Sequence, residues 1–167
     1  MNASSPIHTL PEIFGFTQND VVANREGHLG ANQQKRLRQG RRLWLIGMVT
    51  ALGCWVVVLF NSQELSEVVV VLRVGCILAA LILGYKAYQM HRDLMDNHVS
   101  VFSGEIKLVV KTGKGLLGQK HDPMYFLKMD AHTFKVTHQE YDMLVDGANY
   151  TIFYLARSWV ILSVVPS

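Results

Sequence analysis

The stretch that decides the fold is LWLIGMVTALGCWVVVLF, residues 43–60, which contains no charged residue. At about 1.5 Å per residue, a helix of this length spans roughly 27 Å, close to the ~30 Å hydrocarbon core of a bilayer. A second apolar run, VVVVLRVGCILAALILGYKAY, covers residues 68–88 after the short polar link NSQELSE. Neither run has the polar face that a surface helix of a soluble protein presents. The sequence therefore predicts two membrane-spanning helices that form a hairpin.

Basic residues in the short flanks predict how this hairpin is oriented. The link has no Lys or Arg and carries Glu64 and Glu67, whereas Lys86 and Arg92 lie at the end of the second run and beyond it. Both termini are therefore expected in the cytoplasm, with the link on the outer side of the cell (inner) membrane. Basic and aromatic residues at the inner boundary form a predicted membrane-interface anchor: Lys35, Arg36, Arg38, Arg41, Arg42, Trp44, Tyr85 and Tyr88.

The basic cluster before the first run lies next to the membrane and lacks interleaved aromatic residues, which disfavours nucleic-acid binding. Within the second run, Arg73 lies about 8 Å deep and can snorkel toward Glu67 or the headgroups. A pore or partner contact is the alternative, because an ionisable residue inside a span marks a functional site by default. Cys54 and Cys76 are expected to be small apolar fillers of the spans rather than a disulfide pair.

Small residues recur four positions apart in both runs, a spacing that lets membrane helices approach closely. The pairs are Gly47 with Ala51, Gly75 with Ala79, and Ala80 with Gly84. Packing of the two spans on each other already uses such faces, and packing on a partner's helix is the alternative.

The segments outside the hairpin differ in character. Residues 1–16 contain two prolines and no clear periodicity, which predicts a flexible tail. Residues 17–42 are predicted to form a basic cytoplasmic helical segment, in which Thr17 caps a short helix over 18–26. Residues 89–98 are expected to be a linker that carries the last helical turns out of the membrane.

Residues 99–167 are predicted to form a small cytoplasmic β-barrel domain. Short alternating runs predict strands over 99–111 (bent at Gly104), 124–129, 132–137, 150–155 and 159–164. A capping box at 137–140 predicts a short helix that turns Tyr141, Leu144 and Val145 inward and stops at Gly147. A helix between the third and fourth strands favours an OB-like barrel, with an SH3-like barrel as the second choice.

The most suggestive motif is GKGLLG, residues 113–118, which matches the dinucleotide-binding fingerprint. A strand rather than a helix is predicted after it, and the following Gln119-Lys120 does not fit a P-loop. A flexible hairpin connection is therefore the preferred interpretation. Lys111, Lys114 and Lys120 surround this loop as possible contacts for lipid phosphates or an acidic partner surface, with a solvated charge set as the alternative.

No residue pattern predicts an enzyme. His98, His121, His132 and His138 lack the spacing of a metal site, and neither a Ser nor a Cys lies in a nucleophile elbow. We therefore predict no catalytic residue, no metal and no cofactor.

Together these features predict a non-enzymatic, two-span membrane protein that presents a small cytoplasmic β domain, as an accessory or assembly subunit of a membrane complex. The expected partners are the lipid bilayer and other membrane-protein subunits or further copies of the chain, and not nucleic acid. Two alternatives stay open: a homo-oligomeric channel or transport element, and a membrane-tethered sensor of an anionic lipid or nucleotide. No motif identifies a family, although the layout resembles that of NfeD-type membrane proteins in architecture alone, without carrying over residues or activity.

Overall fold

The computed structural model describes residues 9–61, 67–112, 122–130 and 132–167. By its internal contacts the chain divides into two compact units. One is a helical unit, residues 33–97, and the other is a β unit made of residues 1–32 and 98–167. The predicted Gly-rich loop at 113–118, together with Lys114, Lys120 and His121, lies outside the described residues, as does Glu64 in the link.

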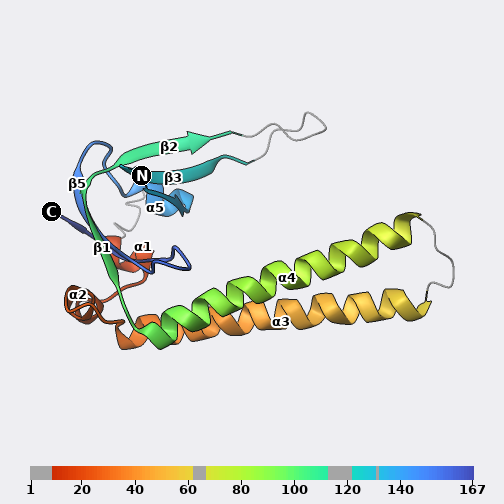
Figure 1. Ribbon diagram of the computed structural model, residues 1–167. Helices are drawn as coiled ribbons and strands as arrows, with labels where there is room; N and C mark the ends of the chain where they lie inside the picture. Colours follow the sequence, from red (N-terminus) through yellow and green to blue (C-terminus); the bar gives the residue numbers. More distant parts are fainter. Residues whose placement is uncertain (1–8, 62–66, 113–121, 131) are drawn as a thin grey trace, which may run out of the picture. The chain divides into compact units, whose positions relative to one another are not determined.

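Two long helices make up the helical unit and run side by side in Figure 1: α3, Ala31–Asn61, and α4, Glu67–Asp96. Both are long and apolar enough to cross a membrane. Most of the large exposed hydrophobic side chains of the described residues belong to these helices, with Leu43 and Val71 about 70% exposed. A water-soluble surface would not keep so much apolar area in contact with solvent. The predicted pair of apolar helices is confirmed, and their insertion into a bilayer stays a prediction.

The two helices contact each other through small residues. A Cβ built on Gly47 would lie 3.4 Å from Leu83, and one built on Gly84 would lie 3.0 Å from Met48. By contrast, a Cβ built on Gly75 meets nothing within 4 Å. Of the predicted small-residue pairs, the one that contains Gly75 therefore lies away from the contact between α3 and α4.

The N-terminal segment is part of the β unit rather than a tail. Residues 9–16, the described part of the expected flexible tail, contain the helix α1, Leu10–Phe14, and place Phe14 and Phe16 in the hydrophobic core. The expectation of a tail over 1–16 is therefore wrong for this part. The segment is short and contains two prolines, so its local sequence gives only a weak helix preference. Burial of two aromatic rings in the core outweighs that weak preference.

The next helix follows its sequence signals closely. Helix α2 covers Gln18–Arg25, begins at the N-cap Thr17 and is followed by Gly27 at a φ of 83°. Its buried Asn24 donates a hydrogen bond from Nδ2 to Oγ of Ser163, 2.8 Å away, in the last strand of the chain. The Val99 amide also donates to the Gly27 carbonyl at 3.1 Å. These bonds attach the N-terminal segment to the β unit.

Six strands form two antiparallel sheets (Figure 1). The first sheet has the order β1-β5-β6, with β1 at Ser100–Glu105, β5 at Asn149–Tyr154 and β6 at Ile161–Pro166. The second has the order β2-β3-β4, with β2 at Lys107–Lys111, β3 at Met124–Met129 and β4 at His132–Val136. The predicted hairpin between β3 and β4 is confirmed.

The single strand expected over 99–111 is two strands, and its break falls at Ile106 rather than at Gly104. The Ile106 amide donates to the Ala148 carbonyl at 3.0 Å, and the Ile106 carbonyl accepts from the Gly147 amide at 2.9 Å. The chain thus leaves one sheet and enters the other at a fully buried, hydrogen-bonded corner. Alternation cannot reveal this corner, because Ile106 continues the apolar pattern of both strands. Among the described strands, the two sheets do not close into a barrel.

The short helix α5 is His138–Asp142, with Thr137 and Glu140 forming the predicted capping box. It ends well before Gly147, and Val145, expected to face inward, is 62% exposed. The last strand likewise begins at Ile161 rather than at residue 159. The helix thus ends earlier and the strand begins later than expected, and such ends are weakly determined by local sequence.

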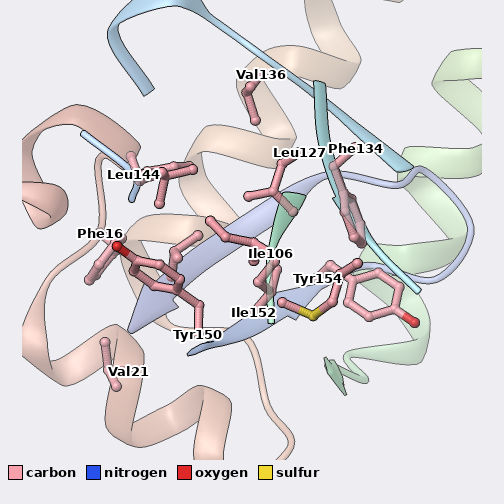
Figure 2. Close-up of a cluster of buried hydrophobic side chains, with 13 residues drawn as sticks. Phe16, Val21, Ile106, Leu127, Phe134, Val136, Leu144, Tyr150, Ile152 and Tyr154 are labelled. Atoms are coloured by element: carbon pink, nitrogen blue, oxygen red, sulfur yellow. The ribbon is translucent and has the colours of Figure 1, made fainter. Parts of the chain in front are cut away.

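The core lies between the two sheets and α1. Figure 2 shows Ile106, Leu127 and Ile152 at its centre, with Phe134 and Tyr154 toward one end. Phe16 and Val21 of the N-terminal segment lie on the side of Tyr150 (Figure 2). Every strand thus contributes at least one residue to this core or to the hydrophobic side chains packed against it.

Candidate functional site

The outer face of the sheet β2-β3-β4 carries a cluster of lysines that we call the basic sheet face. It consists of Lys107, Val109 and Lys111 on β2, Met124, Phe126 and Lys128 on β3, and Lys135 on β4. These residues share one face because directly opposed residues of antiparallel strands point the same way. The opposite face carries Leu127 and Phe134, which are buried in the core. The apolar pattern that builds the core therefore also fixes which residues face solvent.

The lysines of this face are close to one another in the register of the sheet. Lys107 lies directly opposite Lys128, and Phe126 lies opposite Lys135 on the other side. The ammonium group of Lys111 lies 5.1 Å from the centre of the Phe126 ring. None of the residues in β2, β3 and β4 is acidic. The strands therefore present positive charge around a small apolar centre.

Glu105 and Asp130 border one end of the face, and the exposed Asp122 lies two residues before Met124 at the other end. A shallow cavity of about 300 Å³ is lined by Glu105, Lys107, Lys128 and Asp130. Asp130 belongs to the turn after β3 and has a φ of 47°, while Glu105 is the last residue of β1. Like charges directly opposite each other destabilise a sheet, so the Lys107–Lys128 pair is unfavourable for folding.

The neighbouring edge of β2 is already covered. Leu108 donates its backbone amide to Oδ1 of Asp146 at 2.7 Å. A side chain that takes an edge amide in this way limits pairing with a strand of another chain. The face of this sheet, rather than the β2 edge, is therefore the surface it offers to a partner.

A second feature is an aromatic cluster at one end of the β unit. Trp159 lies 5.8 Å from Tyr154 in a nearly parallel arrangement and 5.5 Å from His132. Phe134 meets Trp159 at 5.8 Å, and Phe102 meets His132 at 4.9 Å. Trp159 is 49% exposed and has a φ of 57°. It covers the end of the core, and its ring contacts explain why this conformation is retained.

The histidines do not form a metal site in the part of the chain that the structure describes. No group of three or more His, Cys, Asp or Glu side chains gathers among these residues. His138 instead pairs with Asp142 one helical turn later, with 2.6 Å between Nδ1 and Oδ2. His132 belongs to the aromatic cluster.

The predicted membrane-interface anchor lies entirely on the two long helices. Lys35, Arg36, Arg38 and Arg42 are exposed on α3, and Tyr85 and Tyr88 are exposed on α4. Arg41 and Trp44 are half-buried on α3, and Arg73 is half-buried on α4. Cys54 is exposed and Cys76 is half-buried, each as a free thiol.

Of the predicted lysine contacts, the structure describes Lys111 and places it on the basic sheet face. Sequence reasoning missed Lys107, Lys128 and Lys135, which lie on the same face. The signal was available, because each of these lysines alternates with an inward apolar residue of its strand. What could not be known was the register that brings the three strands together.

No protein-family model, curated protein or solved structure matches this chain. Its function must therefore be argued from its own residues.

Proposed function

We propose that this protein is a non-enzymatic membrane adaptor, in which a two-span hairpin anchors a β domain that binds an acidic surface of a partner membrane protein. The observation that carries the proposal is the basic sheet face, four lysines around the Phe126 ring on strands without an acidic residue. An accessory or assembly subunit of a membrane complex needs such a surface together with a membrane anchor.

The topology supports an OB-like arrangement of the β domain. If β1 and β2 are counted as one strand bent at Ile106, the order of the strands becomes β4-β3-(β2/β1)-β5-β6, and α5 falls between the third and fourth strands. Pairing of β4 with β6 would close this order into a barrel. OB folds generally use the face of their second and third strands for binding. In this chain those strands are β3 and β4, so the analogy favours the same face.

The chemistry of the face favours a protein partner over nucleic acid. Proteins that bind single strands stack successive bases on several exposed aromatic side chains. The described part of this face has one aromatic ring, Phe126, which is half-buried and lies under the Lys111 ammonium. Lysines spread over one face of a sheet instead suit contact with several carboxylates, and such complementary charge also raises the rate of association.

The anchor and its orientation belong to the same proposal. The apolar helices α3 and α4 cross the cell membrane, and the basic residues before α3's apolar part keep both termini in the cytoplasm. The basic sheet face then meets the cytoplasmic part of a partner. If protease confined to the outer side of the membrane removed the β domain, this orientation would be contradicted.

The test compares charge reversal on the face with the same reversal elsewhere. Lys128→Glu combined with Lys135→Glu should abolish co-purification of the native partner with the full-length protein from mild detergent. The matched control combines Arg25→Glu on α2 with Arg157→Glu between β5 and β6, which changes the net charge equally at exposed residues outside the face. Equal yields of partner from both variants would refute the proposal. Binding of the wild type to anionic vesicles but to no protein would instead favour the lipid sensor.

A self-associating channel or transport element is the second candidate, and one observation favours it. Gly75 and Ala79 are exposed on α4, away from its contact with α3, where close packing of a second copy is possible. Arg73 lies on the same helix and would contribute charge to a pore. Reconstituted bilayers should then conduct, and Arg73→Gln should change the ion selectivity.

A further inference from the structure

A groove between α3 and α4 lies at the end of the hairpin where the basic residues are. It has a volume of about 270 Å³. Its lining comes from one face of each helix: Arg41, Leu45 and Met48 on α3, and Gly84, Ala87, Tyr88 and His91 on α4. All of these residues belong to the helical unit. The absence of a side chain at Gly84 keeps the groove open, because a Cβ there would lie 3.0 Å from Met48 Sδ.

The polar end of the groove is formed by Arg41 and His91. Nη1 of Arg41 lies 3.0 Å from Nδ1 of His91. A guanidinium only donates, so Nδ1 is the acceptor and the ring N–H of His91 is at Nε2. Nε of Arg41 is shielded from solvent and has no acceptor among the described residues. Nε of Arg41 thus needs an acceptor at this end of the groove, where Nε2 of the exposed His91 can donate to the same acceptor.

The side chains that line the groove become less polar with depth, as the bilayer does from its headgroups to its hydrocarbon core. Arg41 and His91 lie just outside the apolar runs, Leu45 and Tyr88 lie about one helical turn further in, and Met48 and Gly84 lie deeper still. Charge is therefore followed by an amphipathic ring and then by purely apolar side chains. A single molecule that matches this order has an anionic head and a hydrocarbon tail.

We propose that this groove binds one anionic phospholipid of the cytoplasmic leaflet, with its phosphate on Arg41 and His91 and an acyl chain along Leu45 and Met48. Basic pockets between membrane helices on this side are suited to anionic headgroups. Arg38 lies one helical turn before Arg41 on α3, and Arg92 follows His91 on α4, so their positive charge near the polar end disfavours a lipid with a cationic headgroup. The volume accommodates the phosphate and the upper part of one chain, and the rest of the lipid stays in the bilayer.

The experiment measures lipid retained by the full-length protein in detergent, using native mass spectrometry with added phosphatidylglycerol or phosphatidylcholine. Phosphatidylglycerol should be retained in preference. Arg41→Gln should lower its retention by about tenfold, the loss expected for one charge-assisted hydrogen bond. Arg42→Gln removes the same charge from an exposed neighbour outside the groove and should change retention less than about twofold. Equal losses in the two variants, or equal retention of the two lipids, would overturn the proposal.

A second pair of variants tests the apolar part without touching the charges. Leu45→Trp fills the groove and should displace the lipid, whereas Ile46→Trp adds the same ring at an exposed position that does not line it. Retention that is unchanged by Leu45→Trp would also overturn the proposal. The inference rests on the hairpin lying in a bilayer, which is tested separately by alkaline carbonate washing of vesicles. If the chain stays in the membrane while Arg41→Gln and Arg42→Gln behave alike, only the lipid site is refuted.

Discussion

Truncating Phe16 tests whether the N-terminal segment is an integral part of the β domain. Phe16 is 6% exposed and belongs to the same core cluster as Tyr150 and Ile152. Replacing a buried Phe by Ala costs about 3–5 kcal/mol, from lost apolar burial and the cavity that remains. A domain of this size has only about 5–15 kcal/mol of stability in total. Phe16→Ala should therefore remove a large part of the stability of the whole β domain.

The assay is hydrogen exchange of the full-length protein in detergent, followed in the β5 peptide Asn149–Tyr154, which lies far from residue 16 in sequence. A loss of this size accelerates exchange of the β5 amides on the order of 10²- to 10³-fold, because each 1.4 kcal/mol is a factor of ten. The control is Val22→Ala on α2, whose side chain is 56% exposed and should leave β5 exchange nearly unchanged. If Phe16→Ala speeds exchange only within residues 9–30, the segment is docked without supporting the core, and the reasoning fails.

Three further variants test individual contacts of the β unit through urea midpoints. Trp159→Gly should be at least as stable as Trp159→Ala, because Gly adopts the φ of 57° without the ~1–2 kcal/mol that a Cβ costs there; a clearly less stable Gly variant would contradict this. Gly30→Ala should destabilise by about 2 kcal/mol or more, since its Cβ would overlap the buried carboxylate of Asp20, and an unchanged midpoint would refute that packing. Lys128→Gln should stabilise by about 0.2–1 kcal/mol because it removes the repulsion from the directly opposed Lys107, and a lower midpoint would show that the attraction of Lys128 to Glu105 and Asp130 outweighs that repulsion.

Features set by local periodicity or capping could be predicted from the sequence. The two apolar helices, the cap at Thr17 and the hairpin of β3 and β4 all follow from residues close together in the chain. The placement of Phe14 and Phe16 could not be predicted, because their burial depends on sheets that begin more than eighty residues later. Two buried aromatic residues in a short segment produce no periodic pattern of apolar residues in the sequence.

The basic sheet face could likewise be predicted only in part from the sequence. Alternation within each strand predicts that Lys107, Lys128 and Lys135 face away from the apolar residues beside them. Only the pairing of the strands shows that these lysines share one surface, and that Lys107 and Lys128 are directly opposed. The corner at Ile106 could not be predicted for the opposite reason, since the local pattern is regular there while the backbone hydrogen bonds of Ile106 go to residues 147 and 148.

The groove of the hairpin depends on one alignment of α3 with α4. Gly40 of α3 lies beside Met90 of α4, and Gly47 lies beside Leu83. Because the helices are antiparallel, a step of seven residues toward the C-terminus of α3 matches a step of seven residues toward the N-terminus of α4. The contact between Met48 and Gly84 and the contact between Arg41 and His91 are also seven residues apart on each helix. Seven residues are two turns of closely packed helices, so contacts of this spacing recur along one seam. Close packing at Gly84 therefore places the two polar side chains opposite each other, and the charged end of the groove is a consequence of the small residues deeper in the hairpin.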